Sequence, residues 1–279
     1  AYVQDNSGYF SEASITGMSY HHQLWIRFFE GIGRLVYTST DPIISLYERN
    51  RQRQIKDGAD AARTLVIPNG VEPERFVSIL ANRPLQVPMV LGLIGRIVPI
   101  KDIKTFIRAM RTICSEIPEA QGWLIGPDDE DPEYAEQCRE LVESLQLQEH
   151  VKFLGFQNIA DILPQLGLLV LTSISEAFPL VIVEAYAAGL PVITTDVGGC
   201  REIIEGSEPE DRQLGSAGAV VPIASPEDTA KAAIELLTDS DRWLSAQQAG
   251  LLRVKKYYTR DRVMQSYDQL YRNAHTGVR

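Results

Sequence analysis

The chain has 279 residues, a hydrophobic fraction of 44% and a formal net charge of −10. At ~150 residues per domain, these values indicate a globular protein of about two domains rather than a disordered or fibrous chain. The acidic balance argues against a general nucleic-acid-binding protein, which needs a basic face. The longest apolar runs fall short of the ~20 residues that a membrane-spanning helix requires.

The first 65 residues have the pattern of a domain's last part rather than of a whole domain. They predict a helix over Tyr20–Gly31, a strand over Leu35–Ser39, a helix over Pro42–Lys56 and a strand over Leu65–Ile67. Two strands and two helices are too few to enclose a core. We therefore expect residues 1–65 to be the C-terminal remnant of an N-terminal domain, in a fragment whose remaining part is missing.

The first predicted helix has an aromatic face. Tyr20, Leu24, Trp25 and Phe28 recur at helical spacing. Such a stripe is more often packed in a core than used as a membrane anchor. We expect it to be buried, or exposed if the rest of its domain is absent.

Residues 66–250 alternate strands with amphipathic helices, which is typical of a parallel sheet built from βαβ units. The predicted strands are Val87–Ile97, Gly122–Ile125, His150–Leu154, Leu168–Thr172, Pro191–Thr195 and Ala219–Val221. The predicted helices are one capped by Asp102 and ending before Pro118, then Pro132–Leu147, Ile159–Leu166, one after Pro179, and Arg201–Ile204. The tail is predicted to be helical from Pro226 to Asn273, with a break near Tyr258–Arg260. The fold class is α/β, a doubly wound Rossmann-like domain over 66–250 followed by a terminal helical segment, 251–279.

Two cations follow the first strand of this domain. Gly95 ends the strand, and Arg96 and Lys101 come before the next helix. Open α/β sheets bind ligands at the carboxyl ends of their strands. A guanidinium fork and an ammonium point charge there suit a diphosphate. Taken alone, two solvated surface cations remain the simpler interpretation.

Two glutamates flank the start of a later helix. Glu176 lies in the loop after the strand Leu168–Thr172, and Glu184 lies about two turns beyond it. Helix-start amides near Pro179 would face an anion. Glu184 is surrounded by apolar residues, where an ionised carboxylate is costly without a partner. We favour a binding role for Glu184 over a surface position.

Two turns complete the candidate features. Asn69-Gly70-Val71 follows a strand, and glycine there allows a positive φ. Thr195–Glu202 contains Gly198-Gly199 and opens a short helix. Each is most simply a structural turn.

Together these features resemble a known enzyme family. They are Arg96 with Lys101, the spacing of Glu176 and Glu184, Ala187-Ala188-Gly189-Leu190-Pro191-Val192, and Asn69-Gly70-Val71. The chain resembles a retaining GT-B glycosyltransferase of family 4 (glycosyl transferases group 1). Its Pel exopolysaccharide branch is suggested by Arg96-Ile97-Val98-Pro99-Ile100-Lys101-Asp102, Leu171-Thr172-Ser173-Ile174-Ser175-Glu176 and Ser19-Tyr20-His21-His22-Gln23-Leu24-Trp25.

The resemblance implies a role for each candidate residue. Arg96 and Lys101, after Gly95, would bind the donor diphosphate, and Glu184 would bind the ribose hydroxyls. Glu176 would contact sugar hydroxyls, and with Arg96 and Lys101 it forms the predicted catalytic set. Phe156 and Gln157 would lie by the base. The remaining donor-binding residues would line the sugar and phosphates with their amides: Ala177, Phe178, Pro179 and Leu180. Many members of the family have glycine where this chain has Ala177.

The implied reaction moves a hexosyl unit from a nucleotide diphosphate sugar, preferably a UDP-sugar, to a glycan acceptor in exopolysaccharide synthesis, with retention. The resemblance implies a front-face mechanism, in which a donor phosphate oxygen helps take the acceptor proton. Cations on the leaving diphosphate would supply preorganised charge stabilisation. The run Asp128-Asp129-Glu130-Asp131 is most simply a solvated lead-in to a helix, and no His/carboxylate cluster has ligand spacing. We therefore expect no cofactor and no metal requirement.

Two other functions remain open. One is a nucleotide-sugar binding or regulatory module without turnover, and the other is a sugar-nucleotide epimerase on the same fold. The expected partners are the donor, a glycan acceptor, the missing N-terminal domain and, through peripheral association, a membrane synthesis complex, with no nucleic acid. Three cysteines without CxxC spacing indicate reduced thiols and a cytoplasmic location.

Overall fold

In a computed structural model of the chain, the structure describes residues 20–84 and 86–276, without the side chains of 20–23, 26, 30 and 274–276. Its centre is a six-stranded, wholly parallel sheet in the order β5-β4-β3-β6-β7-β8. The strands are β3 (Val90–Ile94), β4 (Gln121–Ile125), β5 (Val151–Gly155), β6 (Leu168–Leu171), β7 (Val192–Thr195) and β8 (Gly218–Val221). All six strands predicted for this domain are confirmed, with shifts at their ends.

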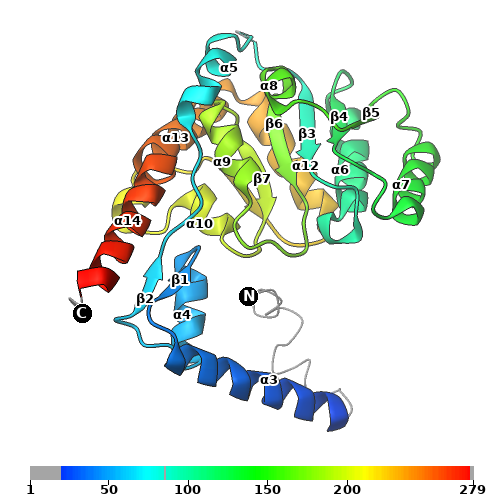
Figure 1. The fold of residues 1–279 in the computed structure, drawn as a ribbon. Helices are drawn as coiled ribbons and strands as arrows, with labels where there is room; N and C mark the ends of the chain where they lie inside the picture. Colours follow the sequence, from blue (N-terminus) through cyan, green and yellow to red (C-terminus); the bar gives the residue numbers. More distant parts are fainter. Residues whose placement is uncertain (1–19, 85, 277–279) are drawn as a thin grey trace.

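Helices cover both faces of the sheet (Figure 1). One face packs on α6 (Ile103–Glu116), α7 (Pro132–Ser144) and α12 (Pro226–Thr238), and the other on α9 (Leu180–Ala187) and α10 (Cys200–Glu205). The shorter helices are η1 (Pro73–Phe76), α5 (Val77–Ala81), η2 (Pro99–Lys101), α8 (Ile159–Ile162), η3 (Leu163–Gln165) and α11 (Pro209–Arg212). Alternate residues of β6 face opposite cores, Leu168 and Val170 on one side and Leu169 and Leu171 on the other.

The order of the strands places a topological switch between β3 and β6, at the middle of the sheet. The chain runs outward from β3 through β4 to β5, then returns to β6 and runs outward again through β7 to β8. In open α/β sheets, the crevice beyond the carboxyl ends of two such strands is the usual ligand site. The loops that follow β3 and β6 therefore define where a ligand is expected.

The N-terminal unit, residues 20–66, comprises α3 (Tyr20–Ser39), β1 (Ile43–Ser45), α4 (Glu48–Lys56) and β2 (Thr64–Val66). Strands β1 and β2 pair in parallel. The strand predicted over Leu35–Ser39 is wrong, because the helical spacing of apolar residues continues through Leu35 and Val36. The helix predicted over Pro42–Lys56 is wrong in its first part, which forms β1 with alternating burial.

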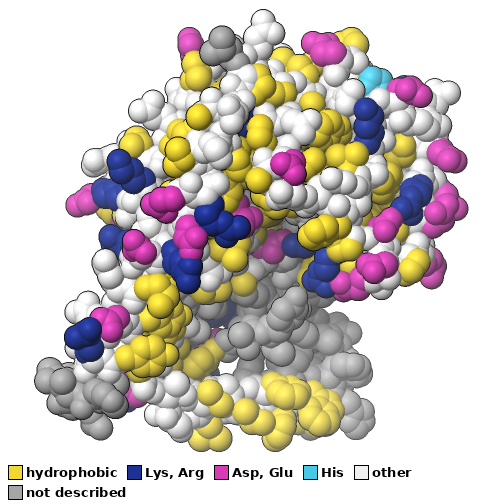
Figure 2. All heavy atoms as spheres, turned by 45° about the horizontal axis from the view of Figure 1, so that its top comes forward, with side chains coloured by type: hydrophobic (Ala, Val, Ile, Leu, Met, Phe, Trp, Pro, Cys, Tyr) yellow, Lys and Arg dark blue, Asp and Glu magenta, His cyan; other side chains and the backbone are white. Residues whose placement is uncertain are grey.

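The apolar face of α3 is uncovered in the described structure. Trp25 is 60% exposed, and Leu24, Phe28, Phe29 and Leu35 are also exposed. The rings of Trp25 and Phe29 stack on one another at 5.8 Å, and apolar side chains gather at the lower edge of Figure 2, where α3 lies. Of the two outcomes expected for this stripe, exposure is observed at Leu24, Trp25 and Phe28, and the side chain of Tyr20 lies outside the described residues. None of the described helices is both long and apolar enough to cross a membrane.

Two carboxylates of the sheet domain contact the start of α4: Glu202, and Asp196, which pairs with Arg49 at 3.4 Å. The side chain of Glu202 on α10 accepts the backbone N–H groups of Glu48 (2.9 Å) and Arg49 (2.7 Å). These are the first two residues of α4, whose own N-cap Tyr47 makes no side-chain capping bond. Glu202 therefore caps a helix of the N-terminal unit from the sheet domain.

The helical tail has the predicted break near Tyr258–Arg260 and a second one, not predicted, at Asp239 between α12 and the next helix. Helix α13 (Ser240–Tyr257) is followed by α14 (Arg260–Thr276), and Thr259 between them forms a parallel bridge with Val71. The Val71 N–H donates to the Tyr258 carbonyl at 2.9 Å. A Cβ on Gly70 would lie 2.8 Å from the Thr259 carbonyl oxygen. This close approach requires glycine at position 70. The expected reason, a positive φ at Gly70, was wrong.

Candidate functional site

The loop after β3 carries the two predicted cations. Gly95 ends the strand, and a Cβ on Gly126, after the neighbouring β4, would lie only 2.1 Å from the Gly95 carbonyl oxygen. This tight pairing of two strand ends fixes the backbone from which Arg96 leaves. The Arg96 guanidinium is exposed and donates to a carboxylate oxygen of Glu130 at 2.6 Å.

Lys101 and Glu176 meet across the switch between β3 and β6. The Lys101 ammonium lies 2.5 Å from Glu176 Oε1, and the Ser173 hydroxyl donates to the same oxygen at 2.7 Å. Their side chains are 22% and 12% exposed, so solvent screens the pair less than a surface ion pair. Residues far apart in sequence, predicted to share one site, are in direct contact.

Buried threonines brace these loops, and sequence reasoning did not identify them as site residues. The Thr172 hydroxyl donates to the carbonyls of Lys101 (3.0 Å) and Asp102 (2.9 Å). The Thr195 hydroxyl donates to the Ser173 carbonyl at 2.5 Å. Both threonines are fully buried at the ends of neighbouring strands. A threonine ending each of two apolar strands was the available signal, because a buried hydroxyl needs a partner.

The start of α9 presents backbone donors. Among the described residues, the N–H groups of Ala177, Phe178 and Leu180 have no hydrogen-bond acceptor. The Ala177 carbonyl instead accepts the Gly199 N–H at 2.8 Å, which ties this loop to the glycine turn after β7. Open amides at a helix start favour an anion. The side chains differ: Phe178 is buried and Leu180 is exposed, with Pro179 as the N-cap.

Glu184 lies on α9 and is half-buried between apolar neighbours. Burial raises the pKa of its carboxyl above the usual value, and the positive charge of Arg75 opposes that shift. In the part of the chain that the structure describes, its carboxylate has no hydrogen bond and no ion pair. A half-buried acceptor of this kind can take hydroxyl donors from a ligand.

Phe156 and Gln157 follow β5, the edge strand of the same sheet. Phe156 is 84% exposed, and the Gln157 amide donates to the Leu154 carbonyl at 2.7 Å. Among the described residues, neither side chain makes a hydrogen bond or ion pair with Lys101 or Glu176. Both residues lie at the carboxyl edge of the sheet, as expected for the ligand site, but they are not part of the Lys101–Glu176 contact.

The acidic run before α7 is engaged in specific contacts rather than being simply a solvated lead-in. Glu130 pairs with Arg96, Asp128 pairs with Arg139, and Asp131 accepts the Tyr134 N–H as the N-cap of α7. Among residues 20–84 and 86–276, no cluster of three or more His, Cys, Asp or Glu could hold a metal ion.

The arrangement is suited to a ligand with adjacent negative charges. Two cations and several open amides lie on loops at the carboxyl edge of the sheet, and a half-buried carboxylate lies on α9. Arg96 and Lys101 each face a carboxylate, at Glu130 and Glu176. When an anion binds, each cation would therefore exchange one anionic partner for another. This exchange costs less free energy than desolvating an unpaired cation.

Comparison with known proteins agrees with this geometry. The family model described as "Glycosyl transferases group 1" matches residues 83–250, and a model described as a domain of unknown function (DUF3492) matches residues 4–62. N-acetyl-alpha-D-glucosaminyl L-malate synthase of Bacillus anthracis is 30% identical over 173 residues, 62% of this chain and 42% of that protein. The chain spans half or less of the length of the first three curated relatives it matches.

Solved structures share the fold. Anabaena Alr3699/HepE in complex with UDP-glucose superposes with a TM-score of 0.72 at 21% identity, over 88% of this chain and 68% of that one. Sucrose-phosphate synthase from Thermosynechococcus elongatus gives a TM-score of 0.74 at 25% identity, over 89% of this chain and 62% of that one. These are GT-B glycosyltransferase neighbours with the same Rossmann-like α/β architecture. With a family model matching more than half of its residues, the chain belongs to the glycosyl transferases group 1 family.

Proposed function

We propose that this chain is the donor-binding part of a retaining glycosyltransferase that moves a hexosyl unit from a nucleotide diphosphate sugar to a glycan acceptor. The observation that carries the proposal is the contact between Lys101 and Glu176 at the switch between β3 and β6. This contact supports the proposal because it brings a candidate cation for the diphosphate and a candidate carboxylate for the sugar within one ligand's length. UDP is the preferred nucleotide, supported by the UDP-glucose in the HepE neighbour.

Donor binding would rearrange the two ion pairs. Lys101 and Arg96 would turn to the diphosphate, and the open amides of Ala177 and Phe178 would complete its coordination. Glu176, released from the ammonium but still held by Ser173, would accept sugar hydroxyls. As the donor bond breaks, the two cations would stabilise charge developing on the leaving diphosphate. The proposed chemistry assigns no step to a metal or cofactor.

The nucleotide preference and the role of Lys101 are tested by calorimetry on the full chain. UDP, GDP and ADP are titrated into the wild type and into Lys101→Ala and Arg96→Ala. We expect UDP to bind most tightly and each variant to weaken UDP binding at least tenfold, about 1.4 kcal/mol. In an enzyme that includes the N-terminal domain, the rate of sugar transfer should fall by orders of magnitude in both variants.

Lys104→Ala is the matched control. It removes the same charge three residues later on α6, where the ammonium contacts Gln137 at 2.6 Å rather than the predicted site. Its UDP affinity should stay within twofold of the wild type. Wild-type affinity in Lys101→Ala, or an equal loss in Lys104→Ala, would contradict the assignment. Binding without sugar transfer by the complete enzyme would instead favour a regulatory binding module, and epimerised donor without acceptor would favour an epimerase.

Exopolysaccharide synthesis in the cytoplasm, beside a membrane synthesis complex, is the setting that we propose for this reaction. It rests on the sequence strings around Arg96, Thr172 and Trp25 that resemble the Pel branch. The division into a donor domain over 66–250, a preceding remnant and a terminal helix is part of the same proposal.

A further inference from the structure

A cavity that does not include the Lys101–Glu176 pair lies where the N-terminal unit meets the helical tail. Its volume is about 290 Å³, at the small end of the ~300–1,000 Å³ typical of ligand pockets. Its walls come from both sides of that junction and are lined by Leu46, Tyr47, Glu48, Val66, Pro68, Phe178, Glu202, Ser207, Glu208, Asp211, Tyr257, Tyr258, Arg262, Val263 and Ser266. Neither Lys101 nor Glu176 is among them.

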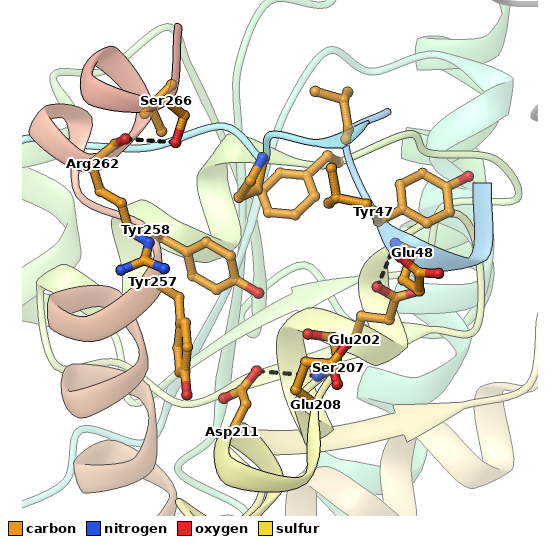
Figure 3. A pocket seen from close by; sticks show the side chains of 15 residues that line it. Tyr47, Glu48, Glu202, Ser207, Glu208, Asp211, Tyr257, Tyr258, Arg262 and Ser266 are labelled. Carbon is orange, nitrogen blue, oxygen red and sulfur yellow. Dashed lines mark hydrogen bonds between the residues drawn. The ribbon is translucent and has the colours of Figure 1, made fainter. Parts of the chain in front are cut away.

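One hydroxyl opens into this cavity without a protein partner in the described part of the chain. Tyr258 is only 5% exposed, its ring packs edge-to-face on Phe178 at 5.5 Å, and its hydroxyl has no hydrogen bond among the described residues. Figure 3 shows that hydroxyl pointing toward the side of the cavity formed by Glu202, Ser207 and Asp211. Burial and the negative charges of Asp211 and Glu202 raise its pKa, so it remains a hydrogen-bond donor at neutral pH. A donor that opens into a cavity and has no acceptor in the protein can take a hydrogen-bond acceptor from an occupant.

The carboxylates around this hydroxyl are mostly compensated. Asp211 pairs with the buried Arg253 at 2.7 Å and accepts the Ser207 N–H at 3.1 Å. Glu202 caps α4 with both oxygens, and Glu48 pairs with Arg51 at 3.0 Å. Because these charges already have partners, the cavity does not require a cation, yet the carboxylate oxygens keep lone pairs that can accept ligand hydroxyls.

The other residues that line the cavity include one acidic and one basic side chain and several aromatic rings. Glu208 and the Arg262 guanidinium both line the cavity, with opposite charges. Arg262 lies over the Tyr257 ring at 5.9 Å. Aromatic faces bury the C–H surface of a ring, while nearby carboxylates and a phenol exchange hydrogen bonds with its hydroxyls. A neutral molecule that both donates and accepts hydrogen bonds can therefore pair with the carboxylates, the guanidinium and the phenol that line the cavity.

We propose that this junction cavity binds a neutral, polyhydroxylated ring, a pyranose unit, with the Tyr258 hydroxyl donating to one ring oxygen and Asp211 and Glu202 accepting ligand hydroxyls. The unit is either a free monosaccharide or one residue of a longer glycan. The cavity contains neither Lys101 nor Glu176 of the donor site described above, although Phe178 borders both sites. Its occupant would contact the N-terminal unit, the sheet domain and α14 together.

Ligand-observed saturation-transfer NMR on the full chain tests this site. Methyl α-D-glucopyranoside, maltotetraose and spermidine are the probes, applied to the wild type, Tyr258→Phe and Tyr267→Phe. Tyr258→Phe removes only the unpaired hydroxyl and keeps the ring that packs on Phe178, so folding should be unchanged. We expect glucoside saturation to fall at least fivefold in Tyr258→Phe and to remain in Tyr267→Phe, whose ring stacks on Tyr271 outside the cavity.

A cavity-filling variant, Ser266→Phe, provides a second test and should abolish the glucoside signal. Equal saturation by glucoside and maltotetraose indicates a free ring, and at least tenfold tighter binding of maltotetraose indicates a residue within a chain. Glucoside signal that survives both variants, no signal from either saccharide, or signal from spermidine alone would overturn the proposal. Lys101→Ala separates it from the proposed function, because that variant should lose UDP binding and retain the glucoside signal.

Discussion

The turn containing Gly198 should control the geometry of the donor loop, and Gly198→Ala is the direct perturbation. Gly198 has φ +52°, and a Cβ there would lie 2.0 Å from the Glu176 carbonyl oxygen and 2.6 Å from that of Ala177. Because such contacts do not occur below about 3 Å, the loop would have to move by about 1 Å. A displacement of ~1 Å at a reacting group can cost ~100-fold in activity.

The left-handed backbone adds a separate cost. An L-residue in that conformation costs roughly 1–2 kcal/mol, which corresponds to a fall in melting temperature of about 2–8 °C for a domain of this size. Gly215→Ala isolates this cost, because Gly215 has φ +85° and a Cβ there would meet no atom within 4 Å. The two variants should therefore lose similar stability from backbone strain, and only Gly198→Ala should also displace the donor loop.

Thermal unfolding and UDP calorimetry on both variants separate the two effects. We expect Gly215→Ala to melt lower and bind UDP as the wild type does, and Gly198→Ala to bind UDP at least tenfold more weakly. The reasoning would be refuted by wild-type UDP affinity in a folded Gly198→Ala protein. A loss of affinity of the same size in both variants would likewise show that the contact with Glu176 is not the cause.

Two further substitutions test electrostatics away from that turn. Burial raises the pKa of Glu184 above its usual 4.5, so the folded state binds the proton more tightly and wild-type stability falls as pH rises from about 4.5 through the folded-state pKa. Glu184→Gln should therefore have a higher melting temperature than the wild type at pH 7, and the difference should shrink toward pH 4. A difference that does not depend on pH would contradict this explanation. Glu202→Ala removes the cap from α4 and should cost about 0.5–2 kcal/mol, whereas Glu205→Ala, which breaks only an exposed pair with Arg201, should cost less than ~1 kcal/mol. Thermal unfolding that shows a larger loss of stability in Glu205→Ala than in Glu202→Ala would count against the capping role.

The sheet domain could be predicted from the sequence because its signals are local. Each buried strand is a short apolar run, and caps such as Asp102 mark where helices begin, as its side chain accepting the Thr105 N–H shows. In the N-terminal unit the β-branched and aromatic residues of Leu35–Ser39 suggested a strand. The helical period that runs on from Trp25 was the stronger signal, and it fixed the end of α3 instead.

The sequence could predict which charged residues lie at the strand ends, but not the contacts that they make. Arg96, Lys101 and Glu176 were identifiable because charged residues followed strand ends. That Lys101 pairs with Glu176, and Arg96 with Glu130, depends on how loops from different strands approach one another. The braces from Thr172 and Thr195 and the junction cavity at Tyr258 depend likewise on tertiary packing, which no local pattern contains.

The bridge between Val71 and Thr259 joins the two segments by which the chain enters and leaves the sheet domain. Backbone hydrogen bonds of 2.9 and 2.7 Å connect these segments, so a displacement of one would be transmitted to the other. The Glu202 cap on α4 is a second connection. Separating the N-terminal unit from the sheet domain would release the two backbone N–H groups that Glu202 accepts, together with the pair of Arg49 and Asp196.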